Sequence, residues 1–163
     1  MIRSRVPAAL ATLLLLAACT AEQAPPAEPV ESDQAAVAAA IDSAFTAFFD
    51  AAKVGDVDAM LTHLTADARI LEPGIRAGRD EFGTIVRELF GADGGVVSID
   101  LRRDDLFGHG DVVYDVGEYD EVLATVHGEM RIEGNYFIRW ERGDDGAWRI
   151  DRVVVGPRAA PEM

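Results

Sequence analysis

The feature that most constrains this chain is a long β-hairpin near its C-terminal end, over residues 128–155. From Tyr136 onward the apolar residues recur at every second position, which is the spacing of a strand with one buried face. Residues 143–146 have the Gly and Asp composition of a hairpin turn, and a run rich in β-branched residues follows. A two-stranded ribbon is not stable alone, so the pattern predicts a curved sheet that other elements cover.

The preceding residues supply that cover. Helical spacing of apolar residues predicts three helices, with Asp56 as the N-cap of the second, and alternation predicts three further strands. The expected helices cover 35–54, 57–64 and 78–90, and the expected strands cover 67–72, 96–103 and 111–122. The expected fold class is therefore α+β, with three N-terminal helices packed on a strongly curved mixed or antiparallel sheet that forms a cone with an open mouth.

Residues 1–18 have the anatomy of a secretory signal peptide. Arg3 and Arg5 give a positive start, and the apolar run that follows is too short to span a bilayer. The segment leads into Leu-Ala-Ala-Cys at 16–19, which resembles the lipobox of bacterial lipoproteins; the alternative is an ordinary signal with an incidental cysteine. The resemblance implies that Cys19 carries a lipid and anchors the chain in the cell envelope, with the outer membrane or periplasmic face favoured because no Asp follows the cysteine.

The mature chain divides into a tether, a domain and a tail. Residues 19–34 contain three prolines, four acidic residues and no aromatic one, so we expect a disordered tether. One domain then covers 35–157, and 158–163 form a disordered tail. Loss of the signal peptide leaves 13 basic against 29 acidic residues, a net charge of −16. This balance disfavours nucleic acid as a partner and assigns membrane contact to the lipid.

Several pieces of the sequence, taken in order, share their pattern with one known superfamily. They are residues 48–59, 66–74, 78–82, 110–119, 134–142 and 146–150. In order and spacing they resemble the nuclear transport factor 2-like superfamily, and within it the SnoaL-like and ketosteroid isomerase-like branch. The resemblance implies a cone-shaped, cystatin-like roll over about 35–157. It implies no single activity, because this fold serves many enzymes and plain binding modules.

Glu72 is the candidate catalytic residue. It precedes a proline at a strand end, where the ketosteroid isomerase-like enzymes carry their general-base aspartate, and a position at the rim of an apolar pocket would raise its pKa. Tyr136 matches one oxyanion-stabilising position of those enzymes, whereas Phe48 at the other cannot donate a hydrogen bond. The alternative is a solvated carboxylate, or one paired with a neighbouring arginine: Arg69, Arg76 or Arg79.

The family register places a set of aromatic, aliphatic and acidic residues on the concave face. The expected pocket-lining residues are Phe48, Tyr114, Val116, Glu118, Ile138, Trp140, Val153 and Val155. Such walls describe a small-molecule pocket and equally a packed interior, and the acidic Glu118 favours the pocket. The three histidines do not form a ligand set and no glycine-rich phosphate loop is present, so we expect neither a metal nor a cofactor.

Two functions from different classes remain open. The first is a lipid-anchored module that binds a small apolar or amphipathic molecule in its cone. The second is a cofactor-free isomerase or cyclase with Glu72 as proton shuttle, which needs a donor aimed at the developing oxyanion. The resemblance also implies a homodimer, since such folds commonly pair through the outer sheet face. The expected seam residues are Phe137, Arg139, Arg152 and Val154.

Overall fold

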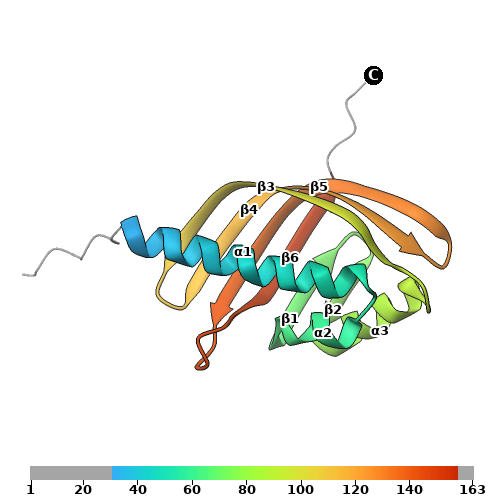
Figure 1. The fold of residues 1–163 in the computed structure, drawn as a ribbon, viewed down its shortest axis with the longest axis horizontal. Helices are drawn as coiled ribbons and strands as arrows, with labels where there is room; N and C mark the ends of the chain where they lie inside the picture. Colours follow the sequence, from blue (N-terminus) through green and yellow to red (C-terminus); the bar gives the residue numbers. More distant parts are fainter. Residues whose placement is uncertain (1–30, 158–163) are drawn as a thin grey trace, which may run out of the picture.

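The structure, a computed structural model, describes residues 31–157 of the 163-residue chain (Figure 1). The predicted signal peptide, Cys19, most of the predicted tether and the tail lie outside the described residues. The helices are α1 (Glu31–Lys53), α2 (Val57–Thr62) and α3 (Arg79–Phe90). The strands are β1 (Leu64–Glu72), β2 (Ile75–Gly78), β3 (Gly95–His109), β4 (Val112–Thr125), β5 (Gly128–Arg142) and β6 (Trp148–Pro157).

The six strands form one sheet in the order β2-β1-β6-β5-β4-β3. Every neighbouring pair is antiparallel except β1 and β6, which run parallel, so the sheet is mixed. Figure 1 shows the long strands β3 to β5 curving over α1, with α2 and α3 beside β1 and β2. The predicted α+β architecture of three helices on a curved mixed sheet is therefore confirmed.

Helix α1 begins at Glu31, four residues before its predicted start, so it takes up the end of the predicted tether. Its Ile41 and Phe45 are buried, which gives the helix one face packed in the core. Residues 34–53 have a mean hydropathy of 1.4 and are long and apolar enough by composition to cross a membrane. Part of this apolar character belongs to the hydrophobic core, in which Ile41 and Phe45 pack.

Local interactions set the start of helix α2 and the turn that leads into strand β2. Asp56 caps α2 as predicted, since its Oδ1 accepts a hydrogen bond of 2.9 Å from the Ala59 amide. The sequence pattern predicts no strand over residues 75–78, where the structure has β2. It forms because Gly74, at a φ of 86°, turns the chain back so that Ile75 pairs with Glu72 in antiparallel register.

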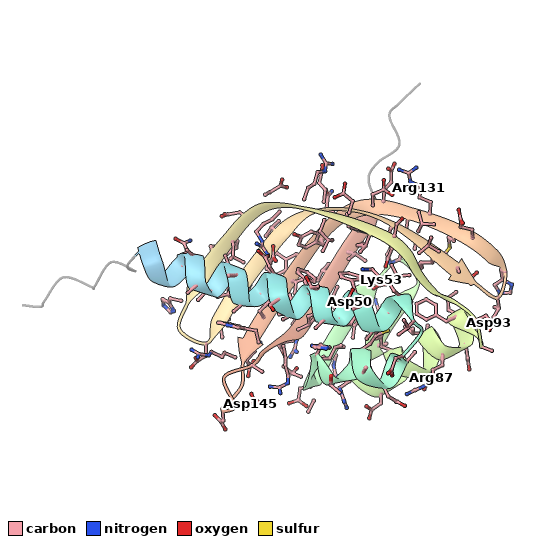
Figure 2. All side chains as sticks on the ribbon, viewed as in Figure 1. Asp50, Lys53, Arg87, Asp93, Arg131 and Asp145 are labelled. Atoms are coloured by element: carbon pink, nitrogen blue, oxygen red, sulfur yellow. The ribbon has the colours of Figure 1, made fainter. Side chains whose placement is uncertain are left out.

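The core consists of two hydrophobic clusters. The first is centred on Trp140, which is fully buried and meets Phe45 edge-to-face with ring centroids 4.8 Å apart. The second lies around α2 and α3 and includes Met60 and Phe90. Figure 2 shows charged side chains at the surface of the fold, and the labelled ones are all exposed: Asp50, Lys53, Arg87, Asp93, Arg131 and Asp145.

Candidate functional site

A cavity of about 550 Å³ lies between the helices and the inner face of the sheet. Every described helix and strand contributes to its wall. Its rim includes Pro73 and Met130, which are both exposed. The volume falls in the range of sites that take small organic ligands, so the cone is only partly filled by its own side chains.

The cavity wall is apolar apart from four side chains. Of the 28 residues that line it, 24 are apolar, and the others are Glu72 on β1, Tyr119 and Glu121 on β4, and Tyr136 on β5. Within residues 31–157, neither Glu72 nor Glu121 has a hydrogen bond or ion pair with another side chain. The alternative in which Glu72 pairs with Arg69, Arg76 or Arg79 is therefore not what this structure holds.

The pKa values of both glutamates are raised in the cavity. Burial raises the pKa of Glu72. Burial, together with the negative charge of Glu72, raises the pKa of Glu121 from 4.5 to about 7. The pKa of Tyr119 is also raised, first by burial and then by the charges of both glutamates. At neutral pH Glu121 is therefore close to its titration midpoint, which is the condition of groups that transfer protons.

Tyr136 is held by a hydrogen-bonded network at the inner part of the cavity. Its hydroxyl donates to Oδ1 of Asp115 at 3.2 Å, and burial followed by the charge of Asp115 raises the pKa of Tyr136. Asp115 has no exposed surface and accepts two further hydrogen bonds of 2.9 Å from the guanidinium of Arg103. Arg103 also pairs with Asp42 of α1 at 2.8 Å. The phenol proton of Tyr136 is thus committed to the protein.

Gly117 makes room for this tyrosine. It pairs with Tyr136 across β4 and β5, and a Cβ at this position would lie 2.8 Å from the Tyr136 hydroxyl oxygen and would clash with the Arg102 carbonyl oxygen. A glycine is therefore required for the ring to lie over the strand. The sequence pattern suggests a bend at Gly117, and the irregularity in the ladder falls on the partner strand between Arg103 and Asp105.

The predicted inward register of β4 is wrong by one residue. Tyr114, Val116 and Glu118 alternate with the residues that face the cavity, so they lie on the outer face of the sheet. There Tyr114 packs against Phe107 and Phe137, with ring centroids 5.4 and 5.6 Å away. A shift of one residue in a strand exchanges its two faces. The inward set consists of Val113, Asp115, Gly117, Tyr119, Glu121 and Leu123.

The other expected pocket residues divide into two groups. Phe48, Ile138, Val153 and Val155 lie in the cavity wall, together with Glu72 and Tyr136. Trp140 does not line the cavity, because it is enclosed by the first core cluster. Its Nε1 has no hydrogen-bond partner within the described residues.

Sequence reasoning missed Asp115, Tyr119 and Glu121. The signal that could have found them is the alternation of β4 taken in its odd register, in which these three share one face with Gly117. No group of three His, Cys, Asp or Glu side chains within residues 31–157 is arranged to hold a metal ion.

No protein-family model matches the sequence, and no curated protein matches it either. Many solved structures do match the fold. A conserved protein from Planctomyces limnophilus has a TM-score of 0.66 at 17% identity, covering 76% of this chain and 99% of its own. A nuclear transport factor 2-like superfamily protein from Salmonella enterica has a TM-score of 0.64 at 13% identity, covering 79% of this chain and 96% of its own.

A third neighbour is a ketosteroid isomerase-like protein from Erwinia carotovora, with a TM-score of 0.62 at 16% identity, covering 80% of this chain and 100% of its own. Structural similarity at such low sequence identity shows the fold of the chain and not its activity. The chain therefore has the nuclear transport factor 2-like fold, as its sequence resemblance predicted.

Proposed function

We propose that this domain binds a small, largely apolar molecule in the cavity between its helices and its sheet. The observation that carries the proposal is the cavity itself, about 550 Å³ in volume and apolar at 24 of its 28 lining residues. Filling such a space with a ligand removes apolar surface from water, and polar groups at a few positions orient what binds.

The test is to fill the cavity from one strand. Ile99→Trp on β3 places a bulky ring in the wall, and we expect it to weaken binding of the neutral apolar dye Nile red by about tenfold. Fluorescence titration of the purified full chain measures the dissociation constant. The matched control is Val97→Trp on the same strand, whose side chain is 55% exposed and outside the cavity wall. Equal affinities for the two variants would argue against the cavity as the binding site.

A second function is favoured by one specific observation, the pair of unpartnered carboxylates inside the cavity. In this alternative the domain is a cofactor-free isomerase or cyclase, and Glu72 moves a proton on an enolisable substrate. The reaction also needs a donor for the developing oxyanion. Tyr136 already donates its proton to Asp115, so Tyr119 is the hydroxyl left to serve.

The variant Glu72→Gln distinguishes the binding function from the enzymatic one. If the domain is such an enzyme, this variant loses turnover of a cyclic enolisable ketone while still binding it, because the amide keeps the shape and removes the base. Turnover measured by deuterium exchange at the α-carbon reports this directly. Exchange that continues unchanged in the variant would leave the enzyme alternative without its base.

We further propose that the mature chain is anchored in the cell envelope by a lipid on Cys19. The support is the sequence pattern of residues 1–19. Intact-mass spectrometry of the chain purified from a bacterial host detects the added lipid. A mass that corresponds to the unmodified polypeptide would argue against the anchor.

The outer sheet face is proposed as the seam of a homodimer. Phe137 and Val154 are 37% and 45% exposed, and Phe107, which is 45% exposed, stacks on Tyr114 beside them. Such a contiguous apolar surface marks an interaction site on a soluble protein. Sedimentation equilibrium at micromolar concentration gives the mass in solution, and a monomer there would contradict the proposal.

A further inference from the structure

The polar groups of the cavity are unusually one-sided in charge. All the titratable side chains that line it are Glu72 from β1, Tyr119 and Glu121 from β4, and Tyr136 from β5. The three helices and the strands β2, β3 and β6 contribute none to the wall. No lysine, arginine or histidine therefore lines this cavity in the part of the chain that the structure describes.

The cavity wall also offers more hydrogen-bond acceptors than donors. Tyr136 gives its proton to Asp115, so toward the cavity its oxygen can only accept. Ionised Glu72 and Glu121 also only accept. When both glutamates are ionised, Tyr119 is the one remaining side chain of the wall that can donate. A ligand whose polar end is a carboxylate or a carbonyl would thus meet one donor and several acceptors, and would leave the carboxylates unpaired.

The carboxylates of Glu72 and Glu121 also attract a positive group electrostatically. Glu72 and Glu121 stand among apolar side chains without an ion pair or hydrogen bond from any described residue, and the charge of Glu72 acts on Glu121. Two like charges in such surroundings are costly, and one cation between them relieves both the repulsion and the lost hydration. The net charge of −14 for the whole chain adds a long-range attraction for cations.

We infer that the ligand of this cavity is a cationic amphiphile, an apolar body that bears a protonated amine placed between the carboxylates of Glu72 and Glu121. This inference rests on the proposed binding function and names its ligand class. The apolar body fills the space lined by residues such as Phe49, Phe82 and Ile132, while the ammonium group meets the acidic side of the wall.

The test compares ligands that differ only in their polar end. Octylamine, 1-octanol and octanoate displace Nile red from the purified full chain, and the three dissociation constants are measured at pH 7. We expect octylamine to bind at least about tenfold more tightly than octanol, since a charge-assisted contact replaces a neutral one, and octanoate to bind most weakly.

A second readout is the proton balance of binding. Because the pKa of Glu121 is raised to about 7, an arriving ammonium group displaces a proton that the pair holds at neutral pH. Calorimetry in two buffers of different ionisation enthalpy should therefore detect proton release with octylamine and none with octanol. Absence of this release would contradict placement of the amine beside the pair.

Variants locate the effect. The double variant Glu72→Gln with Glu121→Gln keeps the side-chain shapes, and we expect its ratio of octanol to octylamine dissociation constants to fall to about 2 or less. Glu88→Gln, an exposed acid of α3 outside the cavity wall, is the matched control and should keep the ratio of the native chain. A preference for octylamine that survives in the double variant, or a native chain that prefers octanol, overturns the inference.

Those outcomes leave the proposed binding function intact, because Nile red is neutral and reports on the cavity alone. A chain that binds neither Nile red nor any of the three octyl compounds overturns the binding function, and the inference falls with it. The two failures are thus distinguishable in one series of titrations.

Discussion

Replacing Arg103 by alanine should lower the free energy of unfolding by about 3 to 5 kcal/mol, measured by urea denaturation at pH 7. The reason is Asp115, which has no exposed surface and takes two hydrogen bonds of 2.9 Å from the Arg103 guanidinium. Without the arginine, a buried carboxylate keeps only the hydroxyl of Tyr136 at 3.2 Å. Leaving a buried charge uncompensated is among the most destabilising single changes in a protein.

The neighbouring arginine provides the control. Arg102 pairs with Glu118 on the outer face, and its side chain is 64% exposed, compared with 25% for Arg103. Exposed ion pairs contribute little, so Arg102→Ala should cost less than about 1 kcal/mol. If the two variants lose equal stability, the network from Asp42 through Arg103 to Asp115 does not hold the inner face of β4 as described.

Glu121→Gln should stabilise the domain, and more so at high pH. The pKa of this carboxyl is raised from 4.5 to about 7 in the folded state. The folded chain therefore holds a proton between these values that the unfolded chain has lost, so stability falls as the pH rises through this window. At pH 8 the native protein carries most of this buried charge, and the glutamine variant carries none of it.

The expected size is a gain in unfolding free energy at pH 8 that exceeds the gain at pH 5 by about 2 kcal/mol, after allowance for the partial solvent exposure of the group. Urea denaturation of both proteins at the two pH values measures it, and comparison at each pH cancels the other titrating groups. Glu88→Gln is again the control. A gain that is the same at both pH values would mean that Glu121 is well solvated. The expected result would show that the native chain keeps a costly acid in its cavity.

Most elements of the fold follow from local chemistry. The β5–β6 hairpin, the cap at Asp56 and the glycine-ended helices are encoded within a few residues, so periodicity and turn composition identify them. The sequence did not predict strand β2, because four residues after a Pro-Gly turn are too few to show a periodic pattern. It becomes a strand only through pairing with β1.

The sequence predicted the site only in part, because it did not show which face of β4 is buried. Its two faces are both mixed in character, since Val113 and Tyr119 alternate with Tyr114 and Val116. Alternation separates such faces but does not say which one is buried. Resemblance supplied a register that was off by one residue, so Glu118 was expected where Glu121 and Tyr119 line the wall.

Local pattern was enough to specify three helices and a long terminal ribbon, because each of these depends on contacts between residues close in the chain or on one repeating apolar face. The placement of Glu72 and Glu121 in one cavity wall and the burial of Asp115 against Arg103 bring together segments that are far apart along the chain. Only the folded arrangement of strands sets those distances, and with them the charge of the cavity.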